Sequence, residues 1–293
     1  MKRLAALLLA GACLPALAQF DFGRALDLGK KVIDSGKKLS EANREFSTEE
    51  EVALGEGITA GFLGAAPLHR DAGLQRYVNR VGKWLALHCE RADLPWSFGV
   101  VDTDTINAFA MPGGTIVVTH GLLKRLNNEA ELAGVLAHEI AHVVKKHQLA
   151  AIQSSMNTSV WADVATTAAG EAVGRRGGSA LTQQGRQLLA NAGIDALKNG
   201  VFLKPLDRSM EYEADRMAVV IAARSGYDPY GFIAVLQMLG QHQGDGSKVS
   251  VFDTHPAAAD RIGELEGFMT TSLDRFAGHG LNDARFRQAV SAR

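Results

Sequence analysis

One five-residue string in this sequence has the residue types and spacing to bind a divalent metal ion. It reads His138-Glu139-Ile140-Ala141-His142 and lies in a run whose apolar residues recur at helical spacing. Residues four apart on a helix project from the same side, so both imidazoles can bind one Zn²⁺ ion. Glu139 can then act as the base that takes a proton from the attacking water. The alternative is an ordinary helix with two histidines on a partly solvated face.

A metal bound by two histidines needs a third protein ligand, and a second acidic string offers one. Glu211 begins the sequence Glu211-Tyr212-Glu213-Ala214-Asp215, which lies on a separate predicted helix. Asp215 comes one turn later on the same face, where it can accept a hydrogen bond from a ligand histidine. Two histidines and one carboxylate leave a coordination position for water, as in hydrolytic zinc sites. Without the upstream motif, this string would be read as an acidic helix face paired with arginines.

A short extended segment provides a candidate for substrate binding. It contains Asn107, Ala108, Phe109 and Ala110 and precedes the turn Pro112-Gly113-Gly114. An extended peptide could add to this strand by backbone pairing if the strand lies at the edge of its sheet. The alternative is an ordinary core strand.

Two further histidines lie near these motifs in the sequence. His255, before Pro256, can donate to the oxyanion of the tetrahedral intermediate, occupy the open metal position in a resting state, or be an ordinary turn histidine. His147 follows His142 by five residues, and we expect it at the protein surface near the end of the helix.

The elements that must position these residues can be read from periodicity and capping signals. Ser47 and Glu50 form a capping box, and Asn128 with Glu131 caps a long helix that we expect to run through His147. Three short strands are predicted, at 96–101, 106–110 and 115–119, and further helices at 74–85, 207–225 and 232–242. The predicted fold class is α+β, mainly helical, with a small β-sheet beside the motif helix.

The first residues predict export. Lys2 and Arg3 precede an apolar run that ends in Ala16-Leu17-Ala18, the pattern of a cleaved signal peptide over residues 1–18. A lipoprotein signal with Cys13 lipidated is the alternative, but Ala10-Gly11-Ala12 lacks the usual large aliphatic residue. Residues 19–46 read as an amphipathic arm, and no later stretch has the length of a membrane span. We expect an exported, periplasmic protein, soluble or peripherally attached to a membrane, such as the outer membrane.

The remaining chain divides into a domain, an insertion and a tail. Residues 47–270 are predicted to form the catalytic domain, with a glycine-rich insertion or lid at 154–205, and residues 271–293 a C-terminal tail. The net charge of −1 gives no basic surface of the kind that binds nucleic acid.

Together the motifs resemble the gluzincin metallopeptidase family of HtpX, BepA and LoiP. The resemblance covers residues 48–267 and rests on 138–142, 211–215, the strand and turn 107–114, and Thr254-His255-Pro256 with Arg261. It implies a zincin-like fold and one Zn²⁺ ion held by His138, His142 and Glu211, with Glu213 not a ligand. The chain lacks the membrane helices and helical repeats of some members, so it is most similar to the exported single-domain members.

These observations predict a zinc endopeptidase that cleaves unfolded or misassembled proteins of the cell envelope. Glu139 would act as the base and Asp215 would orient a ligand histidine. A metal-containing chaperone that holds such clients with little cleavage is the alternative. The sequence leaves the physiological substrate and the oligomeric state open.

Overall fold

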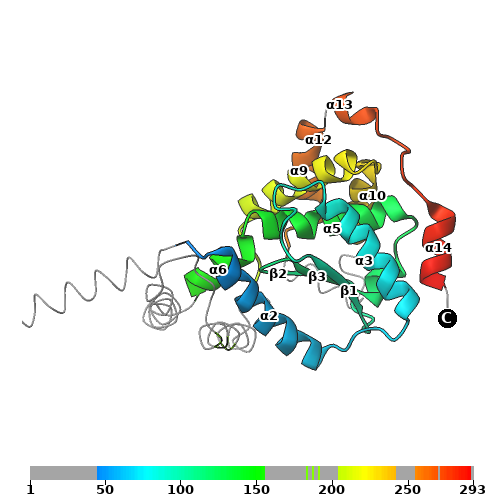
Figure 1. The fold of residues 1–293 in the computed structure, drawn as a ribbon. Helices are drawn as coiled ribbons and strands as arrows, with labels where there is room; N and C mark the ends of the chain where they lie inside the picture. Colours follow the sequence, from blue (N-terminus) through cyan, green and yellow to red (C-terminus); the bar gives the residue numbers. More distant parts are fainter. Residues whose placement is uncertain are drawn as a thin grey trace, which may run out of the picture.

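A buried helix runs through the centre of the molecule, between a small sheet and a second layer of helices (Figure 1). This computed structural model describes residues 45–155, 204–241, 255–269 and 271–291, with Gln183, Gln187 and Asn191. The predicted signal peptide, nearly all of the N-terminal arm and most of the 154–205 insertion lie outside the described residues. Those expectations stay predictions.

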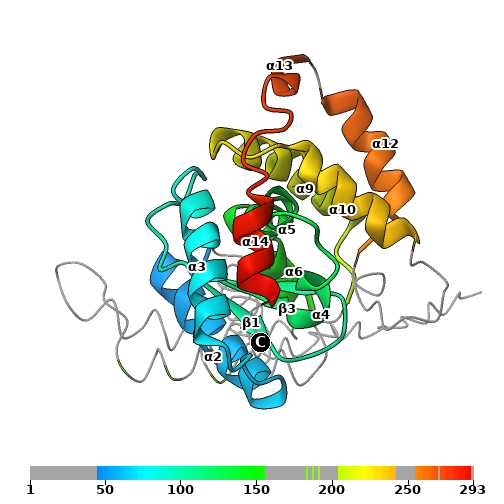
Figure 2. The ribbon, with the colours of Figure 1, turned by 90° about the vertical axis from the view of Figure 1, so that its right-hand side faces the viewer.

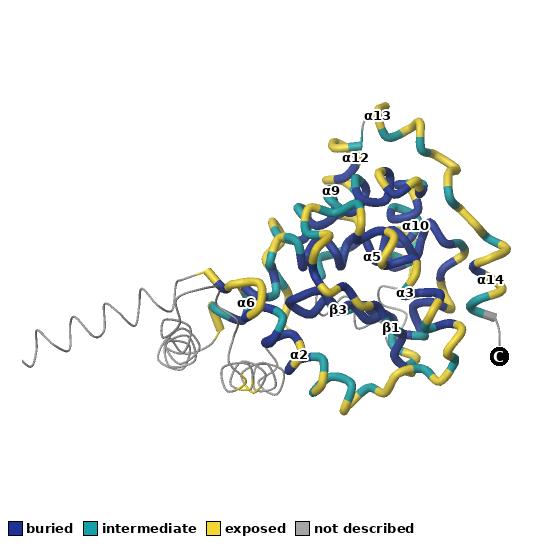
Figure 3. The backbone as a smooth tube through the Cα atoms, in the orientation of Figure 1, coloured by how far each residue is buried: buried dark blue, intermediate teal, exposed yellow. Residues whose placement is uncertain are grey.

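The central helix is α5, Glu129–Val144. Asn128 caps it by accepting a hydrogen bond from the Glu131 backbone N–H, as the sequence predicts. Every residue of α5 except Val144 is buried, which Figure 3 shows as an almost continuous dark tube. A helix buried on all sides must satisfy its polar side chains from the elements around it. The polar residues of α5 therefore mark where other elements meet it.

The sheet in the described part of the chain has three strands, in the order β1-β3-β2. β1 (Ser97–Val101) runs parallel to β3 (Thr115–Thr119), and β2 (Ala108–Met111) is antiparallel to β3. Gly113 and Gly114 turn the chain between β2 and β3 with φ of 81° and 105°. A Cβ on Gly113 would lie 2.6 Å from Val52 Cα, so this turn requires glycine. The order leaves β2 at an edge of the sheet.

The two faces of the sheet belong to different hydrophobic clusters. Ile116 and Val118 pack into the main core with α5, while Val117 faces the cluster of α2. This is the period-two alternation of a strand covered on both faces. In Figure 1, α2 (Thr48–Ala65) lies on the opposite side of the sheet from α5.

The other helices surround this centre. The capping box of Ser47 and Glu50 is confirmed at the start of α2. α9 and α10 pack on α5, α12 packs on both, and α3 packs on β1. The bounds of these helices and of the shorter ones are α3 Ala72–Ala86, α4 His120–Leu123, α6 His147–Ser155, α9 Arg208–Arg224, α10 Tyr230–Gln241, α12 Ala258–Phe268, α13 Thr271–Asp274 and α14 Asp283–Ser291. A mainly helical protein with a small mixed sheet confirms the predicted α+β class.

The C-terminal residues join the core. Helix α14 packs beside α3 (Figure 2), and its Phe286 is buried in the main hydrophobic cluster. The sequence set residues 271–293 apart as a tail, and nothing in it indicated that Phe286 would be buried. Within the described residues, no helix has both the length and the apolar character that a membrane crossing requires.

Candidate metal centre

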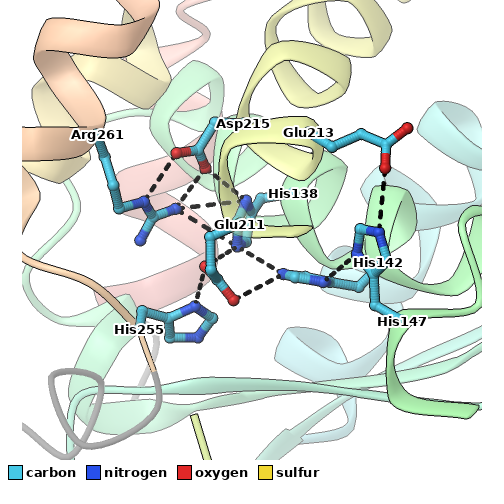
Figure 4. Close-up of polar contacts among 8 residues, drawn as sticks. All are labelled: His138, His142, His147, Glu211, Glu213, Asp215, His255 and Arg261. Carbon is cyan, nitrogen blue, oxygen red and sulfur yellow. Dashed lines mark hydrogen bonds and ion pairs between the residues drawn. The ribbon is translucent and has the colours of Figure 1, made fainter. Parts of the chain in front are cut away.

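Three side chains from two helices converge near the C-terminal end of α5 (Figure 4). His138 Nε2 and His142 Nε2 lie 3.0 Å apart, and Glu211 of α9 faces both. Its Oε2 atom lies 3.6 Å from His138 Nε2 and its Oε1 atom 3.5 Å from His142 Nε2. All three side chains are buried. The structure thus brings together the three residues that the sequence predicts as ligands.

The chemistry of this donor set fits a zinc ion. Glu211 is fully buried, yet its Oε1 atom has no hydrogen-bond partner in the described part of the chain. A buried carboxylate oxygen without a donor costs free energy, and a bound cation would remove that cost. Two imidazole nitrogens and one carboxylate are also the ligand types of hydrolytic zinc sites.

His138 is held from behind by a charged pair. Its Nδ1 atom lies 2.9 Å from Asp215 Oδ1, and Arg261 of α12 donates to both Asp215 oxygens at 2.5 and 2.9 Å. Burial alone would raise the pKa of Asp215, but the Arg261 guanidinium outweighs it and lowers that pKa to about 2. The ionised Asp215 accepts the Nδ1 proton of His138, which leaves the Nε2 lone pair free for a metal. Asp215 thus lies where its predicted orienting role requires.

His142 has a different kind of partner, His147, and the expectation that His147 lies at the protein surface is wrong. Burial, followed by the interaction with the neighbouring His138 ring, keeps the pKa of His142 well below its ordinary value, so the ring is neutral. Its Nδ1 atom lies 2.9 Å from His147 Nδ1, and His147 is 4% exposed instead of at the surface. The predicted helix through His147 ends earlier, at Val144, and Lys146 adopts φ of 57°. This turn starts α6 and directs the His147 ring back towards His142.

Glu139 lies beside the ligands and lines two adjoining cavities. One also contains Ala108, Phe109 and Ala110 of the edge strand β2, and the other contains His138 and Asn107. Burial raises the pKa of Glu139. A carboxylate whose pKa is moved upwards is a better proton acceptor for water near neutral pH. Glu139 is therefore placed as the predicted base.

The predicted substrate strand lines both cavities, and Ala108 borders each of them. Ala108, Phe109 and Ala110 line the cavity that also contains Glu139 and His255, together with Lys204 and Leu206. Asn107 is buried, and its backbone bonds to Thr119 on β3. Asn107 therefore lies just before the residues of β2 that pair with β3, and the next three residues contribute to the lining of the cavity.

His255 completes the cluster. Its Nδ1 atom lies 2.5 Å from Glu211 Oε2, and it joins the three predicted ligands within a group whose ligand atoms all lie within 4.8 Å of one another. Burial opposes ionisation of Glu211, but the contact with His255, together with the neighbouring His142 and His138, outweighs it, so the pKa of Glu211 lies well below its ordinary value. The two functional roles predicted for His255, donation to the oxyanion and occupation of the open metal position in a resting state, both require a position this close to the ligands.

Another potential ligand set, His69, Asp102 and His120, lies at the carboxyl ends of β1 and β3. The sequence indicated no site there. The Asp71 backbone N–H donates to His69 Nδ1 at 3.2 Å, which places the proton of the neutral ring on Nε2. Neither nitrogen of His69 then has a free lone pair for a cation. The cluster on α5 and α9 is the one arranged for a metal.

Comparison with known proteins agrees with this geometry. A profile of peptidase family M48 matches residues 72–269. The chain belongs to peptidase family M48. The beta-barrel assembly-enhancing protease of Yersinia pestis is 31% identical over 228 residues, which cover 76% of this chain and 44% of that protein. The mitochondrial metalloendopeptidase OMA1 of Schizosaccharomyces pombe is 30% identical, over 66% of this chain and 52% of that protein.

The metalloprotease YcaL of Escherichia coli (strain K12) is 30% identical over 167 residues, which cover 57% of this chain. The chain spans about half the length of these relatives. The resemblance found in the motifs is thereby confirmed, and the residues matched by the family profile include His138, His142, Glu211 and His255.

Sequence reasoning missed two residues of this M48 centre. His147 carried no motif of its own, and its burial depends on the turn at Lys146. Phe232 of α10 was recognised only as part of an apolar helix, but its ring stacks on His138 with centroids 5.4 Å apart. A short spacing from His142 was the one available signal for His147.

Proposed function

We propose that this chain is an exported zinc endopeptidase that hydrolyses peptide bonds in unfolded or misassembled proteins of the cell envelope. The observation that carries the proposal is the buried Glu211, whose two oxygens face His138 and His142 while Glu139 lies beside them. Its Oε1 atom has no hydrogen-bond partner among the described residues. We infer that His138, His142 and Glu211 bind the metal. Zinc bound there would supply a Lewis acid that polarises the scissile carbonyl and lowers the pKa of water.

The side chains of the protein divide the remaining steps. Glu139 accepts the proton of the attacking water and passes it to the leaving amine. Asp215 and Arg261 hold His138 in the tautomer that can ligate. His255 lies against Glu211 at the rim of the cavity, where it donates to the developing oxyanion in our proposal. In the absence of substrate, His255 would be a fourth ligand of the metal, since its ligand atom and those of the other three residues all lie within 4.8 Å of one another.

Edge strand β2 supports the choice of an extended peptide as substrate. A chain that pairs with β2 uses main-chain hydrogen bonds, which do not depend on sequence. Such pairing requires an unfolded segment. Next to it, Ile106, Val135 and four residues of α10 line an apolar cavity that also contains Glu139 and His138, where an apolar side chain of the substrate fits. The four are Phe232, Val235, Leu236 and Leu239.

Two observations support the cell envelope as the place of action. The N-terminal residues have the pattern of a signal peptide. Relatives named beta-barrel assembly-enhancing protease match 76% of the chain. The name of those proteins connects them with the assembly of β-barrel proteins, and we propose a related role in protein quality control for this chain.

Purified protein without residues 1–18, incubated with unfolded casein, tests the proposal. We expect about one zinc ion per chain, cleavage of casein, loss of cleavage with a chelator and its return with added zinc. Glu139→Gln should keep the zinc and lose the cleavage. If the wild-type protein binds casein as tightly as Glu139→Gln does and neither cleaves it, the chain is a client-binding module.

A further inference from the structure

The two metal-facing histidines have different partners on their outer nitrogens. Behind His138 stands the ionised Asp215, paired with Arg261. Behind His142 stands a second imidazole, His147, at 2.9 Å. His147 is itself 4% exposed, and its Nε2 atom lies 3.4 Å from Glu213 Oε2. Lys145 Nζ lies 2.6 Å from Glu213 Oε1. Figure 4 shows this row from the centre outwards, except for Lys145.

Proton positions along this row follow from the chemistry of imidazole. A histidine that ligates through Nε2 has its lone pair there, so the neutral ring of His142 carries its proton on Nδ1. The Nδ1–H group of His142 must then donate to His147 Nδ1, which accepts with its own lone pair. The neutral ring of His147 therefore carries its proton on Nε2, the atom that faces Glu213. If His147 Nδ1 accepts from His142, the proton of His147 must be on Nε2, and Glu213 is the group that accepts it.

We propose that His147 is a positioning residue that holds His142 in the metal-binding tautomer, and that Glu213 fixes His147 in turn. The inference rests on the proposed metal role of His138, His142 and Glu211. It gives a definite role to Glu213, which is not a ligand, because its carboxylate accepts the Nε2 proton of His147 while Lys145 holds the carboxylate in place. The side chain of Glu213 is 43% exposed, so its effect on the centre must pass through His147.

Variants that separate the acceptor from the bulk of the side chain test this proposal. His147→Leu fills a similar volume without an acceptor, whereas His147→Asn places an amide oxygen near the position of Nδ1. We expect His147→Leu to weaken zinc binding roughly 10–100-fold, as for other partners of ligand histidines. His147→Asn should recover most of the affinity. His88→Leu, at a half-buried histidine just after α3, controls for the loss of a histidine.

Glu213 supplies a second, independent pair. Glu213→Gln keeps an oxygen that accepts from His147 Nε2–H, whereas Glu213→Leu removes it, and both changes are at a half-exposed side chain that the fold tolerates. Glu213→Leu should weaken zinc binding and Glu213→Gln should weaken it less. In the double variant, Glu213→Leu should have no further effect once His147→Leu is present, because its influence passes through His147.

Zinc affinity is measured by competition with a chromophoric chelator on the full chain without its signal peptide, and thermal unfolding of the metal-free variants checks their folds. Wild-type affinity in His147→Leu would overturn the proposal, as would an undiminished effect of Glu213→Leu in the His147→Leu background. If His147→Leu does not fold, the Glu213 pair decides, and equal affinities of Glu213→Gln and Glu213→Leu overturn the proposal. A wild-type protein that binds no zinc would instead refute the proposed function.

Discussion

A fully buried glutamate lies at each end of helix α5, but the two carboxylates differ in how many hydrogen-bond donors surround them. Glu129, the first residue of α5, accepts hydrogen bonds from Tyr77, Tyr227 and Asn282 at 2.7, 2.8 and 3.0 Å and pairs with Arg285. Glu211, near the other end, contacts His255 through one oxygen and leaves the other unpaired in the described part of the chain. Both side chains are 0% exposed.

The difference separates a structural carboxylate from one arranged for a cation. Burial of an ionised carboxylate is tolerated when donors surround it, and Glu129 has donors from α3, α14 and the chain after α9. It thereby ties the C-terminal residues to the start of α5. Glu211 is surrounded mainly by imidazole nitrogens that are themselves ligand types. The fold therefore stabilises one end of α5 fully and leaves the other end for a metal.

The largest expected effect is on catalysis at the metal end. Glu139→Gln should lower peptidase activity by about 10³-fold, because a positioned general base contributes on that order. Glu131→Gln is the matched control, since Glu131 lies on the same helix with similar burial. The amide oxygen of the introduced glutamine can still accept from the Asn127 backbone N–H. Casein cleavage rates at saturating zinc measure both. Equal loss of casein cleavage in the two variants would contradict the assignment of catalysis to one end of α5 and of structural stabilisation to the other.

A second prediction concerns the structural end. Phe286→Ala should lower the free energy of unfolding by about 3–5 kcal/mol, because it removes a buried aromatic ring from the main core. The zinc content of the folded protein should not change. Urea unfolding and metal analysis test the two statements, and Leu281→Ala, at a 36% exposed site nearby, should cost far less. Loss of zinc from folded Phe286→Ala would mean that the two ends are coupled.

The smallest effect is a pH dependence of stability at Glu129. Burial alone would raise its pKa, but hydrogen bonds from Arg285, Tyr77 and Tyr227 outweigh burial and lower the pKa below the ordinary value of 4.5. A lowered folded-state pKa gives stability that is present above pH 4.5 and is lost as the pH falls towards the folded-state value. Glu129→Gln should cost about 1–3 kcal/mol at pH 7, and its difference from wild type should shrink below pH 4.5. A constant difference in urea unfolding from pH 7 to 3.5 would be inconsistent with this.

Much of the metal end could be predicted from the sequence because its signals are local. The spacing of His138 and His142 is fixed by helical geometry, and Glu211 with Asp215 follows the same rule on α9. The capping box at Ser47 and the strand at 115–119 are local in the same sense. Each of these features depends on residues a few positions apart.

What the sequence did not indicate depends on contacts between distant segments. No local signal marked Glu129, since its partners Tyr77, Tyr227 and Arg285 are far away in the chain. His147 was expected at the surface because no local signal marks the turn at Lys146. Arg261 was noticed through the family resemblance, but its pairing with Asp215 required the packing of α12 on α9. The tertiary arrangement alone brings these groups together.

Zinc content and stability of Glu211→Gln and Glu129→Gln, measured side by side, decide whether α5 has one metal-binding end and one structural end. Glu211→Gln should lose its zinc and its peptidase activity, while the metal-free protein loses less stability than Glu129→Gln does, because the Glu211 carboxylate has one hydrogen-bond partner among the described residues, His255, from which an amide oxygen can still accept. Glu129→Gln should keep one zinc ion per chain and lose stability. Zinc retained at the wild-type level and affinity in Glu211→Gln would show that Glu211 is not a ligand and that the two ends do not differ in this way.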